Sequence, residues 1–490
     1  MHPRRVGRPH RFAIVFIALA LTTGLVMVAA PAPVPASSGQ GIKKVDARVL
    51  RAVQGGKSAT YWAILSKRAD LSGATAVKDW NARGWYVHNK LTGMANSSQR
   101  GLRAMLRAKG VSYRPFWIIN AVRITSNARV LKAVAARSDV TRILPRWSHK
   151  LAPVTRTKDI SAIEWNIAHI NADDVWNTYN DRGEGVTVAN IDTGVQYNHP
   201  ALRLQYRGLK SIGGPTIRPN HNYAWYDPSR VCSPDGKQVC DNNGHGTHTM
   251  GVIVGDDGGS NQIGVAPRAT WIAAKGCESN FCTDSALLAS GEWMLAPRNL
   301  NDQNPRADLR PHVVNNSWGG GGGDPWYQST VQAWVASGIF PGFSPGSSGP
   351  SCGTVGSPGD YPESYAVSAH DMNNNIASFA SRGPSDFGGE IKPNVTAPGV
   401  SIRSSVPNNN YAIFSGTSMS LPHIVGTVAL IWGNNGAPSL RRDIAGTRAI
   451  IDQTAIDVSN LTCGGSPGDN NVWGEGRLDA FAAVTAAKGL

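Results

Sequence analysis

Acidic residues are scarce in the first 150 positions of this 490-residue chain, which hold 4 Asp against 26 Lys and Arg. Cysteine is absent before Cys232, and no apolar run after about residue 30 is long enough to span a bilayer. We also find no internal repeat, which argues against a solenoid. Residues 151–490 carry 22 Lys and Arg against 29 Asp and Glu, so the basic charge belongs to the N-terminal part alone. This distribution argues against nucleic-acid binding, and the opposite charges suggest that the two parts are partners within one chain.

The N-terminus has the pattern of an export signal. Basic residues precede an apolar segment over 12–30, and small residues and prolines follow it over 31–39. This order predicts a signal peptide over 1–36, with cleavage after Ala36. A retained membrane anchor is the alternative, because the apolar segment is long. We expect a secreted protein with no membrane contact after cleavage.

Residues 57–146 show the pattern of a small α+β domain. Strands are expected at 61–65, within 111–125 as a pair, and at 140–145, with helices at 98–108 and 127–136. The resulting order, β-α-β-β-α-β, predicts a ferredoxin-like unit.

From residue 166 onward, short apolar strands alternate with helical segments. Strands are expected at 185–191, 270–274, 313–316 and 339–340. Such strands are typical of a parallel sheet covered by helices on both faces, so the second part is predicted to be an α/β domain.

One stretch in this second part places a serine at the start of a buried helix. Gly416-Thr417-Ser418-Met419 leads into an apolar run over 424–432. Unpaired backbone N–H groups and the positive end of the helix dipole favour a developing oxyanion at such a terminus. Ser418 would then need a base to accept its proton and a carboxylate to orient that base.

Two other segments supply these groups. Asp192 ends an apolar strand and begins the motif Asp-Thr-Gly, while His245 lies in Gly-His-Gly-Thr-His at the start of a helical run. Asp-Thr-Gly also occurs in aspartic proteases, but those need two such carboxylates and this chain has only one. His248, in the same motif, is expected to be structural.

Taken in order, D-T-G, G-H-G-T-H and G-T-S-M make the chain resemble the subtilisin-like serine proteases, the subtilase family. The resemblance extends from about Ile160 to the C-terminus, including the block Trp-Gly-Glu-Gly-Arg-Leu-Asp-Ala over 473–480. It implies a three-layer fold with a mostly parallel central sheet, and peptide-bond hydrolysis through an acyl-enzyme. Ser418 would be the nucleophile, His245 the general base, and Asp192 the group that orients His245.

The resemblance also implies a zymogen. The ferredoxin-like unit is similar to the propeptide that assists folding in this family and inhibits the enzyme with its tail. Residues 37–150 would then be linker and propeptide, residues 151–490 the catalytic domain, and the polar segment 148–161 the processing zone. The expected partners are peptide or protein substrates and the chain's own propeptide, without nucleic acid.

Two segments resemble the family's substrate cleft. Ser317, Trp318 and Gly319 match the edge segment that pairs with an extended peptide. Gly356, in Thr-Val-Gly-Ser-Pro-Gly, matches the floor of the pocket for the residue before the scissile bond.

Two positions depart from the family pattern. Ser347 stands where the family has the oxyanion-hole asparagine, and it would share that hole with the backbone N–H of Ser418. A serine hydroxyl is shorter and is expected to reach the oxyanion poorly, which would weaken activity. Leu421 replaces a usual alanine and could displace Ser418 by its volume.

The cysteines and a possible calcium loop complete the predictions. In an exported protein six cysteines favour disulfides in any of 15 connectivities. Close spacing suggests Cys232–Cys240 and Cys277–Cys282, which leaves Cys352 with Cys463. Half a zinc site at 277–282 is the alternative. Calcium is common in the family, but Ala201 replaces a usual aspartate, and the loop over 256–261 reads as a solvated acidic turn. We therefore expect no cofactor.

Two functions remain open. The first is an exported serine endopeptidase made as a zymogen, with activity attenuated by Ser347 at the oxyanion position. The alternative is a feeble homologue that acts as a peptide-binding module, and turnover of peptides would separate the two.

Overall fold

The computed structural model describes residues 42–151, 163–210 and 219–490. The expected signal peptide, and the processing zone beyond Leu151, lie outside these residues. Within the described ranges, no helix has both the length and the hydropathy needed to cross a bilayer.

The N-terminal unit is the predicted ferredoxin-like fold. Its sheet has the order β2-β3-β1-β4 with antiparallel neighbours, and the order of elements β-α-β-β-α-β is confirmed. The strands are β1 (Ala59–Leu65), β2 (Ser112–Phe116), β3 (Ala121–Ser126) and β4 (Val140–Pro145). The helices are α1 (Ala47–Ala52), α2 (Trp80–Ser98), α3 (Arg100–Ala108) and α4 (Ala128–Ala135).

Helix α2 was not predicted, since the sequence pattern indicates only a helix over 98–108. Its buried apolar residues, Val87, Leu91 and Ala95, form a narrow stripe at four-residue spacing. The helix contacts α10 (Gln328–Ser337) of the second part, where Arg83 donates to the carbonyl of Ala336 at 2.7 Å. The helix that α2 packs against is therefore remote in sequence, and the local sequence pattern gives little indication that residues 80–98 are helical.

The second part is built on a seven-stranded sheet of order β13-β12-β11-β10-β6-β8-β7, in which every pairing is parallel. Its strands are β6 (Thr187–Asp192), β7 (Trp225–Tyr226), β8 (Thr270–Lys275), β10 (Val313–Asn316), β11 (Phe340–Phe343), β12 (Tyr365–His370) and β13 (Val395–Pro398). The four predicted strands are confirmed within a few residues. The others were missed because they are short or carry several polar residues.

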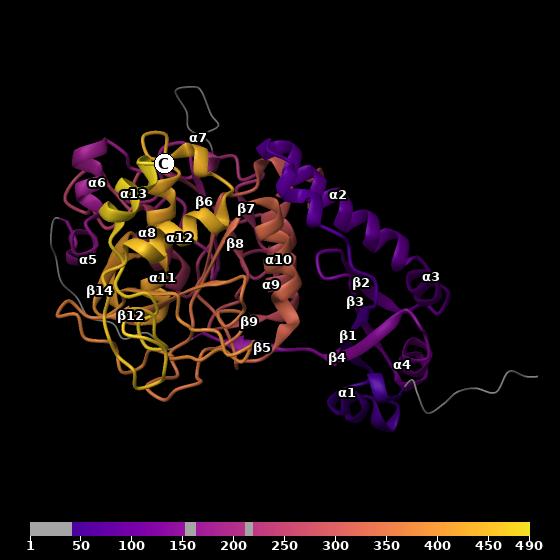
Figure 1. Cartoon of the computed structure of the whole chain (residues 1–490). Coiled ribbons are helices and arrows are strands. Elements are labelled where there is room, and N and C mark those ends of the chain that lie inside the picture. Colours follow the sequence, from indigo (N-terminus) through magenta and orange to yellow (C-terminus); the bar gives the residue numbers. More distant parts are fainter. Residues whose placement is uncertain (1–41, 152–162, 211–218) are drawn as a thin grey trace, which may run out of the picture.

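Helices cover both faces of this sheet. Helices α9 (Asp284–Leu295) and α10 lie between the sheet and the N-terminal unit (Figure 1). Helix α11 (Thr417–Ile431) contacts β10, β12 and β13 and packs against α8 (His245–Val254) and α13 (Ala480–Lys488). The remaining helices are α5 (Trp165–His169), α6 (Ala172–Tyr179), α7 (Arg207–Lys210) and α12 (Ile444–Thr454). The predicted three-layer α/β fold is confirmed.

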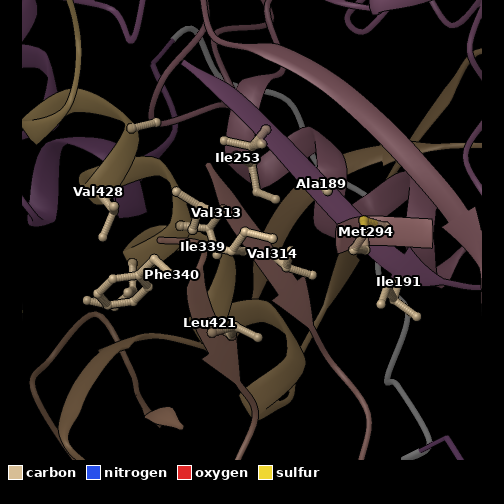
Figure 2. Packing of buried hydrophobic residues seen from close by; sticks show 14 of the residues in the cluster. Ala189, Ile191, Ile253, Met294, Val313, Val314, Ile339, Phe340, Leu421 and Val428 are labelled. Carbon is tan, nitrogen blue, oxygen red and sulfur yellow. The ribbon is translucent and has the colours of Figure 1, made fainter. Parts of the chain in front are cut away.

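The main core lies against β6 and β10, the two central strands. Ala189, Ile191, Val313 and Val314 are fully buried, which is why these positions of the two strands are apolar. Figure 2 shows them among side chains from α8, α9 and α11. The same cluster includes Trp62 and Phe116 of the N-terminal unit, so the interface between the two parts continues the core.

Two antiparallel pairs and three disulfides complete the second part. β14 (Ile402–Val406) pairs with β15 (Asn410–Phe414), and β5 (Ser148–Lys150) pairs with β9 (Phe281–Thr283). The disulfides are the ones that the spacing suggests, Cys232–Cys240, Cys277–Cys282 and Cys352–Cys463. The zinc alternative is therefore excluded, because both of its thiols are in a disulfide.

Candidate active site

Asp192 and His245 meet at the carboxyl edge of the sheet. Asp192 ends β6 and is fully buried, and its Oδ1 lies 2.7 Å from His245 Nδ1 at the start of α8. The same oxygen accepts the backbone N–H of Thr193 at 2.7 Å. Because Nδ1 donates to Asp192, the neutral ring leaves Nε2 as its proton acceptor.

The protonation of His245 reflects two opposed effects. Burial by itself lowers its pKa, but the charge of Asp192 and the hydrogen bond to it, together with the charge of Asp241, raise the pKa above its ordinary value. Nε2 is buried and has no hydrogen-bond partner among the described residues. This nitrogen is the atom that a general base would use.

Ser418 lies in the first turn of α11 and is tied to the segment after β10. Pro422 has no N–H, so the carbonyl of Ser418 lacks its usual partner four residues on. Ser317 supplies one, since its Oγ donates to that carbonyl at 3.0 Å. In return, Ser418 Oγ donates to the carbonyl of Ser317 at 3.2 Å. In this arrangement the Ser418 hydroxyl is hydrogen-bonded to the backbone carbonyl of Ser317, and it makes no hydrogen bond to the described side chain of His245.

Two buried asparagines connect the segments that carry these groups. Asn190 of β6 and Asn315 of β10 are paired in register, and Asn315 Nδ2 donates to Asn190 Oδ1 at 2.8 Å. Asn190 Nδ2 donates to the carbonyl of Gly246, next to His245, while Asn315 Nδ2 also reaches Ser317 Oγ at 3.1 Å. These residues were missed, although an asparagine inside an apolar strand was a signal for them.

The predicted oxyanion position has a hydroxyl partner. Ser347 Oγ lies 3.3 Å from Thr417 Oγ1, which also lies 2.6 Å from Ser344 Oγ. Thr417 Oγ1 donates to the carbonyl of Gly346 at 3.1 Å. The Ser347 hydroxyl therefore contacts the side chain of the residue that precedes the proposed nucleophile.

The volume of Leu421 is accommodated by a glycine in β11. Leu421 is fully buried, and a Cβ atom at Gly342 would lie 2.9 Å from Leu421 Cδ1. The missing side chain of Gly342 thus makes room for the leucine.

A cavity of about 540 Å³ adjoins Ser418. Its walls include residues 317–321, Ser344 and residues 346–348, so the predicted Ser317, Trp318 and Gly319 line it together with Ser347. Trp318 is only 3% exposed, and it packs edge-on against Tyr327 and Phe343. Gly356 does not line the cavity. It lies behind the wall, where a Cβ would be 2.0 Å from the carbonyl oxygen of Gly320.

The end of the N-terminal unit enters this cleft. Residues 148–151 line the cavity beside Ser418, and β5, which includes three of them, pairs with β9. Farther out, Glu292 of α9 accepts the backbone N–H groups of Trp117 at 2.6 Å and Ile118 at 3.3 Å. Burial raises the pKa of Glu292 to about 7. The unit is thus attached both along the cleft and on the outer helix.

Two other expectations concern residues near the site. His248 Nε2 contacts the carbonyl oxygens of Ile402 and Ala412, and its ring stacks on Phe414, which agrees with a structural role. In the loop 256–261 the carboxylates accept backbone N–H groups of the same loop. Within the described ranges, no group of three or more His, Cys, Asp or Glu could hold a metal ion.

Comparisons with known proteins agree with this geometry. The model of the Subtilase family matches residues 183–476. Bacillopeptidase F of Bacillus subtilis (strain 168) is 40% identical over 391 residues, or 76% of this chain, although the match spans only 26% of that longer protein. Subtilisin E of the same strain is 28% identical over 367 residues, which cover 74% of this chain and 84% of subtilisin E. Alkaline elastase YaB of Bacillus sp. (strain YaB) is 30% identical over 308 residues, 63% of this chain and 68% of the elastase.

Proposed function

This chain belongs to the subtilase family of serine endopeptidases, and from that premise we propose that it is an exported protease made as a zymogen, with Ser418, His245 and Asp192 as its triad. The observation that carries the proposal is the 2.7 Å contact between Asp192, at the end of β6, and His245, at the start of α8. Helix α8 packs against α11, whose first turn carries Ser418.

In this proposal Ser418 Oγ attacks the carbonyl carbon of the scissile bond. Its proton passes to His245 Nε2, and the charge of Asp192 stabilises the imidazolium that forms. The hydroxyl must first turn from the carbonyl of Ser317 toward Nε2, and catalytic hydrogen bonds often form fully only when substrate binds. His245 then protonates the leaving amine, and water hydrolyses the acyl-enzyme by the reverse sequence of proton transfers.

The oxyanion would be bound by the backbone N–H of Ser418 and, less effectively, by Ser347. We infer that the Ser347 side chain contributes little to binding the oxyanion, because serine is shorter than asparagine and its hydroxyl contacts Thr417 Oγ1. The enzyme is therefore expected to be slower than relatives that carry the asparagine.

The N-terminal unit is proposed to be the inhibitory propeptide. Support comes from residues 148–151, which line the cavity beside Ser418, and from the opposite net charges of the two parts. A peptide in this place blocks access of any other substrate until it is cut and released.

The test is to express the full chain for export beside Ser418→Ala and to follow product size with time. The wild type is expected to lose about its first 150 residues, while Ser418→Ala keeps them. Loss of the same segment from both would mean that host proteases do the trimming. If neither is trimmed and a serine-reactive probe does not label the wild type, the peptide-binding alternative replaces this proposal.

A further inference from the structure

The outer side of the N-terminal unit, opposite its interface with the second part, is built by three helices. Side chains of β1 alternate between two cores: Trp62 belongs to the core shared with the second part, whereas Tyr61 and Ala63 pack with residues of α1, α3 and α4 in a separate core. The sheet therefore faces the second part on one side and these helices on the other. Figure 1 shows α3 and α4 on the side of the unit away from the second part.

The exposed charges of these three helices are all basic. None of the helices contains an acidic residue. Asp46 and Asp139, which lie close to α1 and α4 in the chain, are paired with Arg48 and Arg137. We call the basic face the surface formed by the exposed side chains of Arg51, Arg100, Arg107, Lys109, Arg129 and Lys132.

The basic face is continuous across α3 and α4. A Cβ atom at Gly101 of α3 would lie 2.8 Å from the guanidinium of Arg137, just after α4. The two helices are therefore neighbours, and both pack on the same side of the sheet. Arg129 and Lys132 are three residues apart, so they share one side of α4.

The positive charge of the unit is not used in direct ion pairs with the second part. Among the described side chains, no ion pair joins the two parts. The charged groups at their interface bind backbone groups instead, as when Arg83 donates to the carbonyl of Ala336 and Glu292 accepts two N–H groups. Residues 42–151 nevertheless hold 22 Lys and Arg against 4 Asp. This excess charge on the solvent side attracts a separate anionic partner.

The N-terminal sequence indicates which anionic surface lies nearest to the basic face. Only residues 31–41 separate the apolar segment over 12–30, the expected export signal, from the N-terminal unit. Eleven residues span at most about 40 Å when fully extended, so an uncleaved signal holds the unit beside the membrane. Bilayers with anionic headgroups attract clusters of Lys and Arg, by about fivefold in affinity for each side chain near the surface.

From the sign, exposure and position of these side chains we propose that the basic face docks the zymogen on an anionic lipid bilayer, and that loss of the N-terminal unit releases the enzyme. Docking prolongs membrane contact beyond removal of the signal, contrary to the expectation from sequence. Residues 151–490 carry 22 basic against 29 acidic groups, a net charge of −7, so the same surface repels them. Docking needs no catalysis, whereas the release step rests on the proposed function.

The test uses the exported Ser418→Ala chain, checked by mass to keep the N-terminal unit and to lack the apolar segment. Vesicles of phosphatidylcholine are prepared with and without about 30% phosphatidylglycerol. At about 50 mM NaCl the protein is expected to sediment with the anionic vesicles only, and about 500 mM NaCl should release it. Neutralising four residues of the basic face should weaken binding at least about 10²-fold, in the variant Arg100→Gln, Arg107→Gln, Arg129→Gln and Lys132→Gln.

A matched control removes four exposed basic groups from the second part, and it should change binding less than about twofold. Its substitutions are Arg203→Gln, Arg230→Gln, Lys237→Gln and Lys488→Gln. Equal losses in the two variants, or equal binding to neutral vesicles by the unsubstituted protein, would overturn the proposed docking. Binding to soluble polyphosphate without binding to vesicles would also overturn it, in favour of a soluble polyanion.

The release step is tested with the wild-type chain on the anionic vesicles. After cleavage verified by size, the enzyme part is expected in the supernatant and the N-terminal unit in the pellet. An enzyme part that stays in the pellet after cleavage would overturn release by charge. A chain that docks but never cleaves itself would overturn the proposed function and leave the docking supported.

Discussion

Replacing Ser347 by asparagine is expected to raise kcat, because it would restore an amide donor at the oxyanion position. The serine hydroxyl now lies 3.3 Å from Thr417 Oγ1, so it must give up that contact before it can donate to the substrate. Loss of one oxyanion donor costs about 10²–10³ in kcat, or about 2.7–4 kcal/mol, a figure that comes from subtilisin itself and not from this chain. Because a serine hydroxyl can still supply part of that stabilisation, we expect Ser347→Asn to raise kcat between severalfold and about 10²-fold.

The assay is steady-state hydrolysis of a peptide anilide, with the enzyme concentration fixed by active-site titration. KM should change little, because the donor acts on charge that develops only in the transition state. Ser351→Asn is the matched control, since Ser351 is an exposed serine that does not line the cavity and should leave kcat unchanged. Ser347→Ala tells whether the hydroxyl contributes at all. An unchanged kcat in a folded, titratable Ser347→Asn enzyme would refute the view that this donor limits the rate.

Three further predictions follow from the described contacts. Activity requires neutral His245, so kcat/KM should fall with decreasing pH through a pKa above 6.5, and Asp192→Asn should lower kcat by about 10⁴ and move that limb to lower pH. Gly342→Ala should destabilise the fold by about 1–3 kcal/mol through its clash with Leu421, and the double variant with Leu421→Ala should lose less stability in chemical unfolding than the sum of the two single losses. Arg403→Met should cost about 3–5 kcal/mol, because it removes the cation that is paired with the buried carboxylate of Glu164.

Each of these has a control and an outcome that contradicts it. Asp192→Asn with an unmoved acid limb would mean that His245 is not the titrating base. Additive losses in the Gly342 and Leu421 double variant would mean that the two residues are not coupled. For Arg403 the partner is Glu164 at 2.9 Å, and the control is Arg268→Met, whose exposed pair should contribute less than about 1 kcal/mol. Equal losses of stability in both variants would contradict the role of burial.

Much of the architecture was predictable because it depends on local pattern. Short apolar runs between helices indicated a parallel sheet, and the alternation in the first part indicated the ferredoxin-like order, since burial on one or both faces determines which residues a strand can carry. Cysteines eight and five residues apart could reach each other with little chain between them, which left the third pair by elimination. The motifs containing Asp192, His245 and Ser418 could also be identified locally, because each places a reactive side chain at a strand end or a helix start.

The remaining features are decided by contacts between segments that are distant in the chain. Pro422 leaves a carbonyl unpaired, but only the fold brings Ser317 to it from about 100 residues away. From the sequence Leu421 is expected to displace Ser418, but in the fold Gly342 of β11 leaves room for its side chain. Helix α2 has only a narrow apolar stripe, and the helix that it contacts, α10, belongs to the other domain. Trp326 lies in no recognisable motif, and only the fold stacks its ring against that of His149. The sequence thus determined which groups can do chemistry, while tertiary packing determined which neighbours position them. Those neighbours lie far away in the chain, so no local sequence pattern identifies them.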